Sequence, residues 1–91
     1  MPTPRFLFSM RLAGRDHGGR VMEDVAARVF RYVGWTSSAI DELVQALNAV
    51  VGPGAGSGEE VEVQFRARDG SCEVVVRFDN REVWRTSRRL P

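Results

Sequence analysis

Alternation of apolar and polar positions begins near the start of the chain. Residues 5–12 spell RFLFSMRL, in which Phe6, Phe8 and Met10 occupy every second position. A period of two is typical of a strand, and the glycines of the segment 13–20 then interrupt the pattern. We therefore predict a first strand followed by a loop.

A first helix is predicted over residues 19–33. Apolar residues recur there at helical spacing, and Gly34 follows as a natural C-terminal stop. Trp35, directly after this glycine, is expected to pack the connection to the next helix against the core.

A second helix is predicted over residues 37–51 from the most regular pattern in the chain. Thr36, Ser37 or Ser38 can accept the free N–H groups of its first turn, and Gly52-Pro53 is expected to end it. We interpret residues 52–60 as a flexible glycine-rich connector to the next strand. The apolar stripe of this helix consists of Ile40, Leu43, Val44, Leu47, Val50 and Val51.

The last third of the sequence predicts a hairpin with a definite register. Asp69-Gly70 between two alternating segments is a strong signal for a two-residue turn. Counting back from this turn pairs Val61 with Phe78 on an apolar face. The opposite face then carries two cross-strand charge pairs, Glu62 with Arg77 and Arg66 with Glu73.

A further strand over REVWRT, residues 81–86, follows if Asp79-Asn80 forms a second turn. In a regular register, Trp84 lies beside Val75 on the outer face, and Val83 joins Val76 on the core side.

The predicted order is β-α-α-β-β with a probable additional β. This order indicates an α+β two-layer sandwich, in which a mostly antiparallel sheet of three or four strands carries two helices on one face. We expect a single domain over residues 1–91, with 1–4 and 88–91 frayed.

Composition is that of a folded protein, since 43% of the residues are hydrophobic and 27% are charged. No apolar segment is long enough to span a bilayer, and the N-terminus lacks a signal-peptide pattern, so we expect a cytoplasmic protein. The 13 basic residues are all arginine, which is typical of a GC-rich bacterial genome. The lone cysteine, Cys72, is expected to pack in the core.

The element order and two segments, AIDELVQALNAVV and VEVQFRARDGSCEVVVRFDN, resemble the ATP-binding fold of histidine kinases and of bacterial anti-sigma-factor serine kinases. The resemblance covers roughly residues 5–80. It implies a site for ATP and magnesium, in which the second helix supplies an acid and an asparagine. The end of a later strand supplies an adenine-binding aspartate followed by glycines.

The nucleotide-binding pattern of this family is incomplete in the chain. Gln45 stands where the acid is expected, and Asn48 lies one position before the place of the asparagine. Asp79 matches the aspartate, but Asn80 follows it in place of glycine. If nucleotide binding survives, Asn48 and Asp79 are its candidate residues; otherwise the chain takes no cofactor. We identify it as a shortened, degenerate member.

Other catalytic or metal patterns are absent from the sequence, so we expect no catalytic or metal-binding residues. Walker, CxxC, HExxH and GxSxG motifs do not occur. His17, the single histidine, and the neighbouring Asp16 are expected in a solvated loop.

The C-terminal segment is the candidate partner-binding region. Trp84 lies there among the arginines, with Arg81 and Arg85 nearest to it and Val75 on the adjacent strand. The function we expect is regulatory binding of a protein, such as a sigma factor or another signalling protein. Two other interpretations remain open: the chain forms a homodimer, or the edge charges only protect the sheet from aggregation through its edge.

Two alternative functions remain. The C-terminal arginines could bind nucleic acid in a small α+β domain, although the net charge of +1 supplies no global attraction for a polyanion. The other alternative, implied by the resemblance, is a nucleotide-binding serine kinase of the anti-sigma type.

Overall fold

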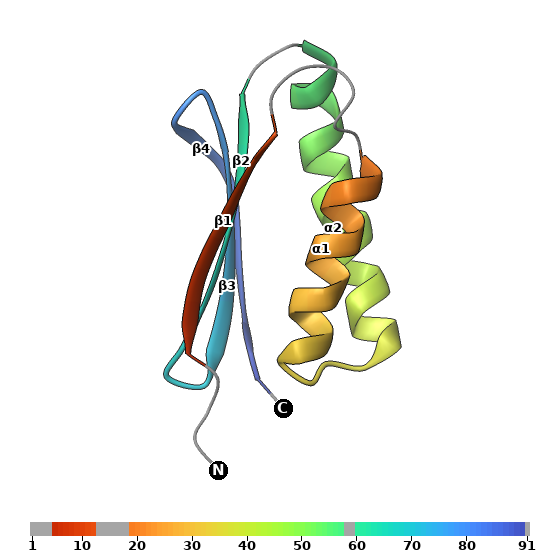
Figure 1. Cartoon of the computed structure of the whole chain (residues 1–91), viewed down its shortest axis with the longest axis vertical. Coiled ribbons are helices and arrows are strands. Elements are labelled where there is room, and N and C mark those ends of the chain that lie inside the picture. Colours follow the sequence, from red (N-terminus) through yellow and green to blue (C-terminus); the bar gives the residue numbers. More distant parts are fainter. Residues whose placement is uncertain (1–4, 13–18, 58–59, 91) are drawn as a thin grey trace.

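The computed structural model describes residues 5–12, 19–57 and 60–90, which form a four-stranded sheet with two helices on one face (Figure 1). Along the chain the strands follow the order β1-β2-β3-β4 in the sheet, and each neighbouring pair is antiparallel. This arrangement confirms the predicted α+β sandwich and its additional strand. The elements are β1 (Phe6–Leu12), α1 (Gly19–Tyr32), α2 (Ser37–Ser57), β2 (Val61–Arg68), β3 (Ser71–Phe78) and β4 (Arg81–Arg89).

Both tight turns of the sheet are made by two residues with positive φ. Asp69 and Gly70 have φ angles of 52° and 76°, and Asp79 and Asn80 have 49° and 68°. Two such residues in succession match the right-handed twist of the flanking strands. The first turn fixes the predicted register, including the pairing of Val61 with Phe78.

The end of α1 is built as a Schellman motif around Gly34, whose φ is 92°. The Gly34 N–H donates to the Arg31 carbonyl at 3.0 Å, and the Trp35 N–H donates to the Phe30 carbonyl at 3.3 Å. The rings of Phe30 and Trp35 then pack with centroids 5.2 Å apart. The predicted helix stop and the packing role of Trp35 are both confirmed.

The second helix begins as expected but ends later. The Ala39 N–H donates to Thr36 Oγ1 at 3.3 Å, which makes Thr36 the residue that caps the helix. The helix then continues through Gly52-Pro53 to Ser57, so the expected end at residue 51 is wrong and the connector over 52–60 is shorter than predicted. A proline removes one hydrogen bond from a helix, and here that loss does not end it.

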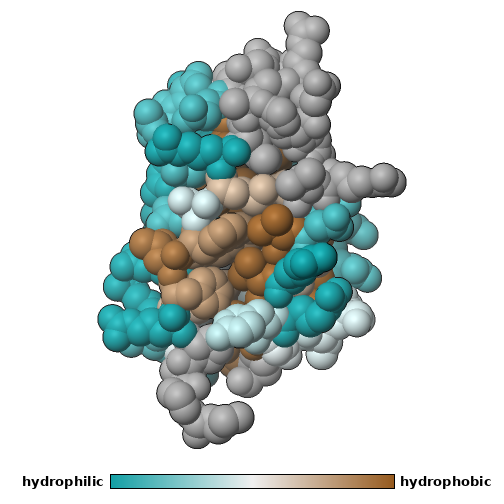
Figure 2. Space-filling view, viewed as in Figure 1, coloured by the Kyte–Doolittle hydropathy of each residue, from teal (hydrophilic) through white to brown (hydrophobic). Residues whose placement is uncertain are grey.

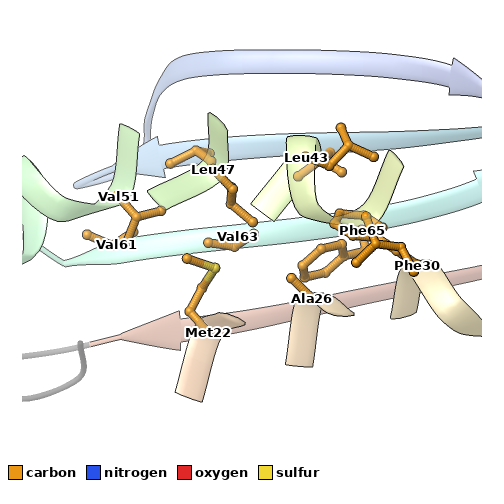
Figure 3. Close-up of a cluster of buried hydrophobic side chains, with 12 residues drawn as sticks. Met22, Ala26, Phe30, Leu43, Leu47, Val51, Val61, Val63 and Phe65 are labelled. Atoms are coloured by element: carbon orange, nitrogen blue, oxygen red, sulfur yellow. The ribbon is translucent and has the colours of Figure 1, made fainter. Parts of the chain in front are cut away.

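The core lies between the two helices and the central strands β2 and β3. Figure 3 shows side chains of α1 and α2 pointing toward Val61, Val63 and Phe65 of β2. The helices contribute Met22, Ala26, Phe30, Ile40, Leu43, Leu47 and Val51, and β3 adds Val74 and Val76. The edge strands β1 and β4 contribute only partly buried side chains.

The register of β4 differs from the regular one that the sequence suggested. A shift between Val76 and Arg77 pairs Val76 with Trp84 and Val75 with Arg85. Trp84 therefore packs against the core cluster on the helix side, while Val83 is 41% exposed. The predicted places of Trp84 and Val83 are wrong because a β-bulge inserts one residue and changes the face of those beyond it.

The C-terminal residues are held by the rest of the fold. The Trp35 Nε1–H donates to the Arg89 carbonyl at 3.2 Å, and the Leu90 N–H donates to the Gly70 carbonyl at 2.8 Å. Strand β4 therefore extends through Arg89, and the expected fraying of 88–90 is not met. Residues 1–4, where fraying was also expected, lie outside the described residues, as does residue 91.

Candidate interaction surface

The two candidate nucleotide-binding residues make separate contacts within the fold. The Asn48 side-chain amide donates to the Glu23 carboxylate, which joins α2 to α1. Asp79 lies in the β3–β4 turn, where its Oδ1 accepts the Glu60 N–H at 3.0 Å and its N–H donates to the Glu60 carbonyl at 2.9 Å. Each residue is engaged with a different part of the chain, and these contacts do not arrange the two around a common ligand.

The sequence-predicted partner residues on β3 and β4 also contact the chain itself. Val75, on the outer face of the sheet, is only 2% exposed. Its neighbour Arg85 donates to the Glu73 carboxylate at 3.0 Å and to the Glu82 carboxylate at 2.7 Å. With Trp84 turned toward the core, Arg81 and Arg85 are the exposed members of the predicted set, and Arg85 is engaged with glutamates.

Opposite charges alternate across the outer face of the sheet. Glu62 accepts hydrogen bonds from Arg11 at 3.4 Å and from Arg77 at 3.1 Å, and the second of these is a predicted cross-strand pair. The hydrogen bond from Arg85 lowers the pKa of Glu82. Arginines that already pair with glutamates leave little uncompensated charge for a polyanion here.

An open apolar groove of about 470 Å³ lies between β1 and α1. Figure 2 shows its apolar side chains gathered near the middle of this face of the molecule. Phe8 is 43% exposed and Tyr32 72%, so large apolar groups meet solvent along the groove. Leu7, 64% exposed, adds an apolar side chain on the outer face of β1. Its lining residues are Phe6, Leu7, Phe8, Arg28, Val29 and Tyr32.

The groove exists because the two helices cover the central strands more fully than β1. Phe8 points to the helix side, where its ring lies 6.1 Å from that of buried Phe65, yet 43% of the residue stays exposed. Phe6 and Tyr32 meet edge to face with centroids 5.9 Å apart and form the end of the groove. The alternation of residues 5–12 predicted which side Phe8 faces but not that it stays exposed.

Arginines surround the apolar groove. Arg28 lines it from α1, and a neighbouring hollow of about 260 Å³ on β1 and β2 is lined by Arg5, Arg66 and Arg68 together with Phe6, Leu7 and Ala67. Among the described residues, the ion pairs of the structure involve none of these four arginines. The rim is therefore basic, although Asp69 and Glu73 lie beside Arg66 and Arg68, and Glu73 accepts a hydrogen bond from Arg85.

Other chemistry is sparse in the part of the chain that the structure describes. Cys72 is buried, as predicted, and burial raises its pKa to about 11. Residues 5–12, 19–57 and 60–90 contain no cluster of His, Cys, Asp and Glu that could hold a metal. The same residues form no helix with the length and apolarity needed to cross a bilayer. Asp16 and His17 lie outside the described residues.

Comparison of the chain with protein-family models, with curated proteins and with solved structures gives no match.

Proposed function

We propose that this chain is a non-catalytic regulatory module that acts by binding another protein through the groove between β1 and α1. The observation that carries the proposal is the exposure of Phe8 and Tyr32 along one groove. Exposed apolar patches of this kind on small proteins mark surfaces for other molecules.

The proposal includes a degenerate ATPase-like fold that works in sigma-factor or two-component signalling. The resemblance of residues 5–80 supports the fold relationship, and the separate engagement of Asn48 and Asp79 supports the loss of nucleotide binding. Regulation then depends on protein contact and not on phosphate transfer.

Photo-crosslinking tests the protein partner. A benzoyl-phenylalanine is placed at position 8 in the full chain in its native cells, with position 83 on the opposite edge as the matched control, since Val83 is 41% exposed. We expect one discrete protein adduct from position 8, which mass spectrometry identifies and which binds the purified chain at a 1:1 ratio. Absence of a heterologous adduct from position 8, or an adduct from position 83 alone, contradicts the proposal.

Calorimetry with ATP and magnesium tests the non-catalytic part of the proposal. We expect no heat of binding at ligand concentrations up to about 1 mM, which excludes affinities stronger than about −4 kcal/mol. Micromolar binding that the Asn48→Ala variant loses would show that the nucleotide site is intact.

A further inference from the structure

The two edges of the sheet are built differently. Strand β4 carries four arginines, Arg81, Arg85, Arg88 and Arg89, and contains the bulge opposite Val76 and Arg77. Charges and bulges are the usual protection of an edge strand against further pairing. Strand β1 pairs with β2 in an unbroken register and has apolar side chains at most of its positions.

The unprotected edge of β1 has two chemically distinct sides. Toward the helices it presents the apolar groove with Phe6 and Phe8. Toward the outer face it presents Arg5 and Leu7, with Arg66 and Arg68 one strand further in. Because successive side chains of a strand point to opposite faces, a strand added beside β1 meets these two environments at alternate residues.

A matching partner strand therefore has apolar residues at every second position, toward the helices, and acidic residues opposite the arginines of the outer face. The chain already contains one such pairing on the other side of β1. There β2 places Glu62 against Arg11 and Val63 against Met10, in the segment EVEV. The same chemistry is available to an incoming strand on the open side.

A second copy of this chain fits less well than an acidic partner. Residues 5–12 contain Arg5 and Arg11 and no acid. Antiparallel pairing of β1 with its own copy brings four arginines together. Arg11 of each copy pairs with Glu62, but the ion pairs among the described residues do not include Arg5, and like charges facing each other across strands are destabilising.

We infer that the groove between β1 and α1 binds an extended protein segment of alternating apolar and acidic residues, which adds to β1 as a fifth strand. This inference rests on the proposed function and specifies its partner. Backbone hydrogen bonds along β1 supply affinity, and the apolar groove and the arginines select the sequence.

The probe is a synthetic, capped eight-residue peptide of alternating valine and glutamate, and its counterpart has lysine in place of glutamate. Calorimetry with the full chain is expected to give binding in the range of about 10 to 100 μM for the glutamate peptide. The lysine peptide should bind at least about tenfold more weakly, and amide exchange should slow in β1 on addition of the glutamate peptide.

Matched variants locate the binding site. Phe8→Thr should weaken binding of the glutamate peptide about tenfold. Val83 has a similar exposure on the other edge, and Val83→Thr should not change the affinity for this peptide. Arg68→Glu should weaken it by a similar factor, while Arg89→Glu on β4 should have little effect. Circular dichroism confirms that each variant is folded.

Three results would overturn the inference: equal affinity for both peptides, loss of binding in Val83→Thr instead of Phe8→Thr, or self-association by sedimentation that Phe8→Thr abolishes. A heterologous crosslink from position 8 with no peptide binding would refute this inference alone. The proposed function falls if position 8 captures no protein partner.

Discussion

Cys72 is a buried side chain whose pKa is raised strongly by the fold. It lies on β3 opposite Ala67 and is 1% exposed, and burial followed by the charge of Glu73 raises its pKa to about 11. The thiolate is the nucleophilic form of cysteine, so this residue is suited to packing and not to redox or catalytic chemistry.

The raised pKa predicts a loss of stability at alkaline pH. The unfolded thiol releases its proton near pH 9 and the folded thiol near pH 11, so deprotonation favours the unfolded chain between these values. The free energy of unfolding should fall by up to about 1.4 kcal/mol per pH unit in this window. Urea unfolding at pH 8 to 11 measures this fall in the free energy of unfolding.

The Cys72→Ala variant is the control for that measurement. The chain has no lysine, so few other side chains titrate in the same window. We expect the variant to be less stable at pH 8 but to lose less stability as pH rises. Parallel pH profiles for the two proteins would contradict the burial of a neutral thiol.

At the scale of the element, two glycines in the helical layer have opposite roles. Gly34 ends α1 with a φ of 92°, a conformation that a Cβ atom strains. Gly52 lies inside α2, where a Cβ built on it meets nothing within 4 Å apart from its chain neighbours. The same substitution should therefore cost less at Gly52 than at Gly34.

Gly34→Ala is expected to lower the free energy of unfolding by about 1 kcal/mol. Gly52→Ala is expected to change it by less than about 0.5 kcal/mol, because the lower backbone entropy cost of alanine in a helix is offset by the contact of its Cβ with the ring of the following proline. Chemical denaturation of both variants measures the two changes. A loss at Gly52 as large as that at Gly34 would contradict the continuation of α2 beyond residue 51.

The bulge in β4 determines which of two adjacent apolar residues stabilises the sheet. Trp84 pairs with Val76 and packs against the core, whereas Val83 is largely exposed. Trp84→Ala should cost about 2 kcal/mol or more, and Val83→Ala less than about 0.5 kcal/mol. If Val83→Ala costs more than Trp84→Ala in thermal or urea unfolding, the result would support the regular register that the sequence suggested.

At the scale of the whole molecule, local patterns predicted the architecture and most of its register. Asp69-Gly70 determined the β2–β3 pairing, since a two-residue turn leaves one choice of partners. Gly34 and the apolar stripes located the helices and their buried faces.

The parts that sequence reasoning missed depend on tertiary context. Val83 and Trp84 are adjacent apolar residues in a strand without alternation, so only packing against the helices decides which one turns inward. The exposure of Phe8 depends on how far two helices extend across four strands, which no local pattern encodes. The candidate groove was missed for the same reason.

The connection between β1 and β2 also bears on how the sheet assembles. Strands β2, β3 and β4 are joined by two-residue turns, whereas the pairing of Phe6 with Ala67 closes a loop that contains both helices. Long loops cost more entropy to close, so the meander of β2 to β4 can form early and β1 docks late. Until then the edge of β2 is open, and a foreign strand of suitable sequence can compete with β1 for it during synthesis.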